Sequence, residues 1–511
     1  MTTELPGLRP VGTLRGPVRG RPGTQSRFGI GFEGLDRRLF EPDRVYPWLG
    51  ELGAGWARVQ SGWSRCEREP GVYDFGWLDE IVDALAQRGV RTLMSLTFGN
   101  QLYSPEAPHE SAVGYTPVHA GEAAVRAWQA YVAALVAHLR GRVNHWEVWN
   151  EPNIPQFWAP EREDGRDYSR LVEATADAVR RVDPEAFIVG GAQSQIDPMF
   201  LQECLEAGMA EHIDAFSFHP YQAVPEHDLR MMHDLGRGLL DRYSPGRRIE
   251  LWQGEAGCPS QAHGHNDDWL GLYSIDEDVQ ATWVARRLVA DRLIGFDRAF
   301  YFHVVDLMAA EYRQSDGRAR PPVLMGLLNG QTYEPKLSFE AYRRVAAVFD
   351  DETVPRPLLW RMEEPETPAP QRSEVLAAPH VGTFVRDGAP LVAYWVSTDP
   401  QQRAGPWQIE VEAWWDRELT LRRPVVVDVV SGRVYAVDRS APVQPPTLGP
   451  VLGERFSLPI ADRPLILTDL DVLDVRLQDA HPESADPLGS LRALRYPRRR
   501  DPSSLSARGS G

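Results

Sequence analysis

The chain of 511 residues carries 72 acidic side chains against 55 Lys and Arg, a formal charge of −17 at pH 7, which disfavours nucleic acid as a main partner because phosphates repel acidic surfaces. Its composition, 42% hydrophobic and 25% charged, is typical of a folded globular protein, and no apolar run approaches the ~20 residues that a membrane-spanning helix needs. We therefore expect no nucleic acid and no membrane partner, and at ~150 residues per domain the length predicts two or three domains.

The N-terminal part and the cysteines bear on the compartment. The first ten residues, MTTELPGLRP, lack the apolar core of a signal peptide. Cys66, Cys204 and Cys258 are widely spaced and odd in number, which is typical of a reducing compartment rather than of a disulfide framework. These features predict a cytoplasmic protein. Residues 1–27, rich in Gly, Pro and Arg, are expected to form an irregular arm.

Between residues 28 and 350, short apolar runs alternate with amphipathic segments of helical spacing. Strands separated by helices pair in parallel, in an open sheet or in a closed barrel, and a count of eight favours a (β/α)8 TIM barrel. The expected strands are Phe28–Glu33, Trp56–Gln60, Thr92–Leu96, His145–Trp149, Phe187–Gly191, Ala215–Phe218, Ile249–Gln253 and Arg298–His303. The expected helices include Leu78–Arg88, Ala123–Leu139, Tyr168–Val182 and Val279–Leu293.

After residue 350 the pattern changes to strand-like runs separated by turn signals, which predicts a small antiparallel β-sandwich domain over residues 351–475. Its tryptophans could bind sugar, pack its core or dock it onto the barrel, and we favour the structural roles. Residues 476–511, rich in Arg, Ser and Gly, are expected to be disordered. The strands expected here are Val381–Val385, Leu391–Val396, Gln408–Trp415, Pro424–Val430, Arg433–Val437 and Pro464–Leu470. The tryptophans meant here are four of those in the domain, Trp395, Trp407, Trp414 and Trp415.

The strongest chemical signal is the sequence HWEVWNEPN at residues 145–153. An apolar strand ends in Asn150 and Glu151, and Pro152 stops it. Catalytic side chains of TIM barrels lie where strands end at the C-terminal face, so Glu151 is expected to project into the mouth of the barrel. The alternative is a glutamate that caps the next helix or pairs with an arginine.

A second apolar run, IELWQGEAG from residue 249, also ends in a glutamate, Glu255. By strand count Glu151 ends the fourth strand and Glu255 the seventh, so the two face each other across the mouth. Two opposed carboxylates are what glycosidic cleavage needs, and a separation of ~5–5.5 Å gives retention of configuration. An ion pair of Glu255 with Arg58 is a compatible structural alternative. Glu147 and Glu250 are set aside because strand alternation places them off the terminal position.

These motifs resemble clan A of the glycoside hydrolases. The resemblance is carried by Trp-Asn-Glu-Pro-Asn on the fourth strand, Phe-Ser-Phe-His-Pro-Tyr (residues 216–221) on the sixth and the glutamate on the seventh. The Asn-Glu-Pro-Asn form with Phe-Trp after it, together with a trailing sandwich, is most similar to family 39, over residues 28–475. The resemblance implies that Glu151 is the acid/base, that Glu255 is the nucleophile and that Asn150 hydrogen-bonds the sugar 2-hydroxyl.

The same resemblance implies supporting roles around the nucleophile. Arg58 would hold Glu255 ionised, Tyr221 would donate a hydrogen bond to it, and His219 would line the same wall. The alternatives are a purely structural ion pair for Arg58 and a satisfied core imidazole for His219. Many clan members place a Trp at the end of the eighth strand, where this chain reads YFHVVD from residue 301.

Two further patterns suggest cofactors but fit poorly. The sequence GIGFEG at residues 29–34 matches a dinucleotide-binding fingerprint, yet its glycines fall within the expected first strand instead of after it. Glu33 is instead expected at the barrel mouth, in contact with a sugar hydroxyl. The sequence HGHNDD at residues 263–268 holds metal-ligand side chains, but we favour a substrate-rim loop there. No metal and no organic cofactor is therefore expected.

The sequence as a whole predicts a retaining O-glycosidase that acts on short oligosaccharides or glycosides. Exo-action is expected because three long loops, after the third, seventh and eighth strands, would wall the mouth into a pocket. The alternatives are an endo-acting clan A glycanase and a non-catalytic carbohydrate-binding relative. The oligomeric state is not predicted.

Overall fold

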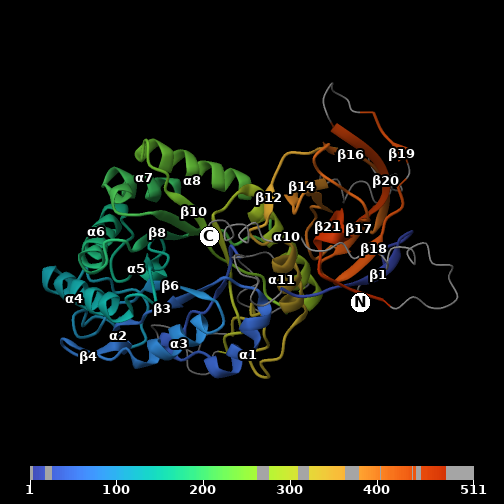
Figure 1. The fold of residues 1–511 in the computed structure, drawn as a ribbon. Coiled ribbons are helices and arrows are strands. Elements are labelled where there is room, and N and C mark those ends of the chain that lie inside the picture. The colour runs from blue at the N-terminus through green and yellow to red at the C-terminus, as the bar shows by residue number, and fades with distance from the viewer. Residues whose placement is uncertain are drawn as a thin grey trace, which may run out of the picture.

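Eight parallel strands close into a barrel in the computed structural model, and antiparallel sheets follow it (Figure 1). The predicted TIM barrel with a β-sandwich is confirmed. The barrel strands are β2 (Phe28–Gly31), β3 (Trp56–Gln60), β6 (Arg91–Leu96), β7 (His145–Val148), β8 (Phe187–Ser194), β9 (Ala215–His219), β10 (Glu250–Ala256) and β11 (Arg298–Tyr301). The structure describes residues 4–17, 26–261, 275–308, 322–362, 379–402, 404–439, 441–444 and 451–478.

Helices follow the barrel strands and cover them from outside. Several begin at an aspartate whose carboxylate accepts hydrogen bonds from free N–H groups of the first turn, namely Asp164, Asp197 and Asp276. In the part of the chain that the structure describes, no helix has both the length and the apolar character needed to cross a membrane. The helices are α1 (Pro42–Leu52), α2 (Trp63–Cys66), α3 (Gly76–Ala86), α4 (Glu122–Leu139), α5 (Pro155–Trp158), α6 (Gly165–Val182), α7 (Pro198–Glu206), α8 (Leu229–Tyr243), α10 (Glu277–Ile294) and α11 (Leu337–Val348). A small hairpin, β4 (Glu67–Glu69) and β5 (Val72–Tyr73), lies before α3.

The barrel interior changes from apolar to polar along the strands. A buried apolar cluster fills the interior toward the N-terminal ends of the strands. Its members are Trp56, Leu93, Val189, Ala215, Trp252 and Phe300. Since every second residue of a strand faces the same side, the residue two positions further also points inward. In this way Arg58 follows Trp56 and Ser217 follows Ala215, both fully buried. An apolar plug therefore supports a polar layer at the C-terminal end of the strands.

Two antiparallel sheets build the sandwich, an eight-stranded one and a four-stranded one. The larger sheet packs on both faces: Trp395 on β15 belongs to the hydrophobic cluster of the barrel, and its neighbour Tyr394 belongs to the sandwich core. The larger sheet contains β12 (Thr353–Pro355), β14 (Pro379–Arg386), β15 (Ala389–Val396), β21 (Leu465–Asp469), β17 (Pro424–Asp428), β18 (Arg433–Ala436), β1 (Arg9–Leu14) and β22 (Val475–Leu477). The smaller contains β13 (Leu359–Met362), β16 (Trp407–Asp416), β20 (Val451–Ile460) and β19 (Ala441–Pro442).

The N-terminal arm differs from the expectation. Residues 9–14, expected to be irregular, form β1 between β18 and β22, and Figure 1 shows this blue strand beside the orange sandwich. The segment forms a strand because its backbone pairs with that of β18 and β22, and because the side chains of Val11 and Leu14 are buried. Strand β22 also runs past the expected boundary at residue 475. The other domain boundaries stay predictions, and residues 479–511 of the expected tail lie outside the described residues.

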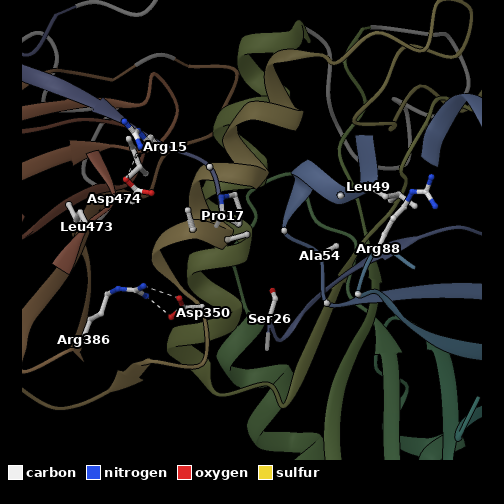
Figure 2. A pocket seen from close by; sticks show the side chains of 18 of the residues that line it. Arg15, Pro17, Ser26, Leu49, Ala54, Arg88, Asp350, Arg386, Leu473 and Asp474 are labelled. Carbon is white, nitrogen blue, oxygen red and sulfur yellow. Dashed lines mark hydrogen bonds and ion pairs between the residues drawn. The ribbon is translucent and has the colours of Figure 1, made fainter. Parts of the chain in front are cut away.

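A cavity of about 980 Å³ lies between the N-terminal end of the barrel and the sandwich (Figure 2). Ser26, which precedes β2, and Arg91, which begins β6, line its barrel side. On the sandwich side Arg386 pairs with Asp350 at 2.8 Å. The cavity is therefore at the opposite end of the barrel from the carboxyl ends of the strands.

Candidate active site

The chain takes an unusual backbone conformation where it leaves β7. Trp149 and Glu151 have φ of 70° and 45°, in the left-handed region that costs L-residues free energy. Neighbouring strands hold this conformation, because Ser95 donates to the Trp149 carbonyl at 3.0 Å and the Glu151 amide donates to Ala192 O at 2.7 Å. The side chain of Glu151 is 11% exposed. The strand end is thus fixed around Glu151.

Glu255 lies within β10, one residue before the strand ends. The preceding residue, Gly254, allows close approach of a neighbour: a Cβ there would lie 3.1 Å from the ring of His219. The glycine therefore lets the imidazole pack directly against the strand that carries Glu255.

The two glutamates meet at His219. His219 Nδ1 lies 3.0 Å from Oε1 of Glu151 and 3.7 Å from Oε2 of Glu255. One carboxylate oxygen of each glutamate and this nitrogen all lie within 4.8 Å of one another. Tyr221 donates a hydrogen bond of 2.5 Å from its hydroxyl to Oε1 of Glu255. His219 thus contacts both glutamates and Tyr221 contacts Glu255, and the roles that the resemblance implies for them stay predictions.

Arg58 is the centre of the charged layer beneath the glutamates. Its Nη1 donates to Glu255 at 3.0 Å and to Glu33 at 2.8 Å, and its Nη2 donates to Oδ1 of Asn150 at 2.9 Å. Its Nε donates to Glu147 at 2.6 Å. The ion pair with Glu255 exists, and it is one part of a wider network in which a single guanidinium orients four acceptors.

Glu147 was set aside from catalysis by strand alternation, and the structure places it inside the barrel below the mouth. Ser217 donates to its second oxygen at 3.0 Å, and the carboxylate is fully buried. Sequence reasoning missed its role as the partner of Arg58. The available signal was the even spacing: Glu147 lies four residues before Glu151, and residues an even number apart on a strand face the same side. This spacing predicts that Glu147 also points into the barrel.

Glu33 lies on the segment after β2, 3% exposed. Burial raises the pKa of Glu33 to about 7, with Arg58 opposing the rise and Glu255 adding to it. Its Oε2 is 3.5 Å from Nε2 of His303, and burial lowers the pKa of His303 to about 4. Glu33 therefore belongs to the site, and its contact with a sugar hydroxyl stays a prediction.

Electrostatics couple the groups around Glu255. Burial raises the pKa of Glu255 and the Glu151 carboxylate adds to the rise, whereas His219, Arg58 and the Tyr221 hydroxyl stabilise the ionised form. Burial alone would lower the pKa of His219, but the two glutamates outweigh it and raise it. Nδ1 of the imidazole, 3.0 Å from Oε1 of Glu151, is within hydrogen-bond distance of that carboxyl group. The site thus brings two carboxyl groups together around one imidazole.

Glu151, His219 and Glu255 are also the one set of three potential metal ligands at ligand spacing within the described residues. The same atoms already engage one another, Arg58 and Tyr221, so an ion there would break the Glu151–His219 contact. The sequence HGHNDD at residues 263–268 lies outside the described part of the chain. In the other cofactor-like sequence, Gly29 and Gly31 lie within β2, as expected.

Part of the chain matches the model of a known family. Residues 55–230 match the model of glycosyl hydrolases family 39. The resemblance to family 39 is confirmed. The matched segment contains Arg58, Asn150, Glu151, His219 and Tyr221, whereas Glu33 and Glu255 lie outside it and join the site through the fold.

Two relatives match part of the chain at about 30% identity. The chain is 30% identical to a beta-xylosidase of Geobacillus stearothermophilus over 173 residues, 30% of this chain and 32% of the relative. It is 31% identical to a beta-xylosidase of Caldicellulosiruptor saccharolyticus over 193 residues, 34% and 37% of the two chains. The matches thus span about a third of each relative's length.

The fold is similar over most of the chain. A family 39 glycoside hydrolase of Bacteroides cellulosilyticus superposes with a TM-score of 0.61 at 17% identity, covering 88% of this chain and 81% of the other. A family 39 beta-xylosidase of Caulobacter crescentus gives 0.52 at 18% identity, covering 90% and 99%. At such identities the likeness concerns the fold.

Proposed function

We propose that this protein is a retaining O-glycosidase. The observation that carries the proposal is the approach of Glu151 and Glu255, whose nearest carboxylate oxygens lie within 4.8 Å. Retaining glycosidases hold their two carboxyl groups ~5–5.5 Å apart, whereas inverting enzymes leave ~6.5–9.5 Å for a water molecule. The distance therefore supports a covalent intermediate and not direct attack by water.

In the first step the ionised Glu255 attacks the anomeric carbon and forms an ester bond to the sugar. The bond between the anomeric carbon and the leaving oxygen breaks, and Glu151 gives its proton to that oxygen. Arg58 and Tyr221 favour the ionised Glu255 before attack. Asn150, with its Oδ1 on Arg58, is oriented to offer its amide N–H groups to the sugar 2-hydroxyl.

In the second step Glu151, now a carboxylate, takes a proton from water as the water oxygen bonds to the anomeric carbon. The ester to Glu255 breaks and frees the carboxylate, so protons and electrons balance over the cycle. Two inversions at one carbon give net retention. In the first step the negative charge passes from Glu255 to Glu151. His219 lies close to both carboxylates and can stabilise the charge on either one.

The substrate class within this proposal is a β-linked pentoside, xylosides first, and the support is that both matched relatives are named beta-xylosidases. Exo-action on short oligosaccharides is part of the proposal. The described loop between β6 and α4 is long, residues 97–121, and parts of the loops after β10 and β11 lie outside the described residues. Product analysis on an oligosaccharide tests this point: single terminal units support it, and random internal cleavage contradicts it.

A panel of aryl glycosides tests the mechanism with the wild type, Glu151→Ala and Glu255→Ala. A good leaving group needs no protonation, so Glu151→Ala should keep glycosylation on it, and added azide should restore turnover by attacking the intermediate. Glu255→Ala should stay inactive on every substrate. Glu250→Ala, in the same strand at its other end, serves as the matched control and should keep wild-type activity. Equal inactivity of both catalytic variants without azide rescue would contradict the assignment of roles.

A further inference from the structure

The hydroxyl that contacts Glu255 belongs to a loop fixed from outside the barrel. Tyr221 lies in the loop of residues 220–228, which joins β9 to α8 and is called the Tyr221 loop below. Helix α10 holds the loop backbone through two side chains. Trp283 Nε1 donates to the Gln222 carbonyl at 2.9 Å, and Arg287 Nη1 donates to the Pro220 carbonyl at 2.9 Å. The backbone on either side of Tyr221 is thus tied to α10.

Glu226, near the end of the same loop, extends this connection to the sandwich. Its carboxylate accepts two hydrogen bonds from Arg286 of α10, at 2.5 and 3.2 Å. A third comes from Trp395 of β15, whose Nε1 donates at 3.0 Å. Arg286 and Trp395 are fully buried and Glu226 almost so. Figure 1 shows α10 between the barrel and the sandwich, where this contact forms.

We propose that Trp395 is a positioning residue for Tyr221, through which the sandwich domain acts on the catalytic site. Its indole N–H fixes Glu226, the Glu226–Arg286 pair fixes the Tyr221 loop, and the loop sets the hydroxyl of Tyr221 against Glu255. A buried acceptor that loses its donor still bears the free-energy cost of its desolvation. Without the indole N–H of Trp395, the Glu226 carboxylate is therefore expected to move, and the Tyr221 loop with it. The proposal goes beyond the glycosidase assignment, and its kinetic readout rests on that assignment.

Displacement of the loop has a defined chemical consequence. Besides Tyr221, Glu255 faces Arg58, His219, Glu151 and Glu33. Loss of the Tyr221 hydroxyl removes one of the donors that favour its ionised form, so the carboxyl keeps its proton to higher pH.

The groups around Glu226 define which change isolates the indole N–H. They are Arg286, Trp395 and Ser397, and His380, whose ring stacks on the indole of Trp395 with centroids 5.2 Å apart. Trp395→Phe removes the indole N–H and leaves Arg286, Ser397 and His380 in place. The phenyl ring can still stack on the ring of His380.

The experiment compares Trp395→Phe with Trp415→Phe. Trp415 lies in the sandwich core, 3% exposed, and its Nε1 has no partner among the described residues. Both variants remove an indole from the same domain, but only the first removes a hydrogen bond to the barrel. The readouts are amide hydrogen exchange in peptides that cover residues 219–228 and the pH dependence of kcat/KM on an aryl glycoside.

Trp395→Phe should raise exchange in the Tyr221 loop and move the acid limb of kcat/KM upward, with a fall of ~10-fold at low pH. In a Tyr221→Phe background it should add little, because the hydroxyl that it positions is gone. Trp415→Phe should leave loop exchange and pH profile as in the wild type. Equal behaviour of the two variants, or looser exchange without a shifted acid limb, would overturn the proposal. Should the wild type cleave no glycoside, the assigned function fails, and exchange alone decides whether Trp395 orders the loop.

Discussion

Glu147 accepts a hydrogen bond of 2.6 Å from Nε of Arg58, and neither side chain is exposed to solvent. This contact fixes the plane of the guanidinium, so that Nη1 reaches Glu33, on the segment after β2, and Glu255, on β10. A buried charge of either sign is tolerated only with partners, which makes the pair a requirement of the polar layer.

Removal of this buried partner should be costly. Glu147→Ala is expected to lower the free energy of unfolding by ~3–5 kcal/mol, because the fully buried Arg58 loses a partner of opposite charge. Urea unfolding measures the loss. Glu250→Ala is the comparison: Glu250 is partly exposed and accepts from Trp252 Nε1 at 2.7 Å, and its loss should cost ~1 kcal/mol. Equal costs would contradict the special position of Glu147.

The Tyr221 hydroxyl should affect the acid limb of activity. Tyr221→Phe removes the 2.5 Å hydrogen bond to Glu255, and a bond to a charged group contributes ~1.5–3 kcal/mol, which corresponds to ~10–100-fold in kcat/KM. Since the bond favours the ionised form, its loss raises the pKa of Glu255 and moves the acid limb to higher pH. Tyr394→Phe, which removes a buried hydroxyl without a partner among the described residues, should leave the profile unchanged.

Glu33 predicts a pH dependence of stability. Its pKa is raised by burial from 4.5 to about 7 in the folded state, so the folded protein binds a proton that the unfolded chain has released. The resulting stabilisation is complete below about pH 4.5 and is lost as the pH rises through about 7, up to ~3 kcal/mol.

Urea unfolding across this pH range tests the effect of Glu33. Glu33→Gln should make the fall in unfolding free energy shallower, while a residual slope remains from Glu255, whose pKa burial also raises. An unchanged slope in the variant would assign the pH dependence to other groups.

Lys336 is the single lysine of the sequence, and it lies buried between two loops. Its Nζ donates to Asp306 at 2.8 Å and to Ser260 at 2.9 Å. Lys336→Met should cost ~3–5 kcal/mol because Asp306 is left without its counter-ion. The double variant with Asp306→Asn should cost less than the sum of the single changes. Additive costs in urea unfolding would show that the pair does not act as a unit.

The sandwich domain should be needed to keep the barrel from aggregating. Deletion of residues 355–475 would expose the apolar surface against which Trp395 and Leu391 pack. We expect the shortened protein to aggregate on expression, as large exposed apolar patches do. Light scattering of the purified protein checks this, and a soluble, fully active barrel would contradict a structural role for the sandwich.

The barrel strands could be predicted from the sequence to within three residues at each end, because burial on both faces makes each one a short apolar run between amphipathic helices. The location of Glu151 and Glu255 at strand ends could be predicted for the same reason, since each follows such a run and is followed within two residues by a Pro or Gly that interrupts it. Their catalytic roles stay predictions. In the sandwich, β20 escaped prediction although Phe456, Leu458 and Ile460 alternate on its buried face. Its charged and glycine residues obscured the period of two.

Interactions between distant segments could not be predicted. The pairing of Glu147 with Arg58 depends on the register of separate strands, and the contact of Trp395 with Glu226 depends on how two domains dock. Neither leaves a local pattern, because each residue alone looks like an ordinary member of its strand or loop. The position of β1 between β18 and β22 could not be predicted for the same reason, because it also depends on pairing with distant segments.

That place of β1 has a consequence for synthesis. Its neighbours β18 and β22 follow it by more than 400 residues, so residues 9–14 leave the ribosome long before either edge exists to receive them. During synthesis this segment has neither of its sheet partners, and the larger sheet is complete only after β22 has been made.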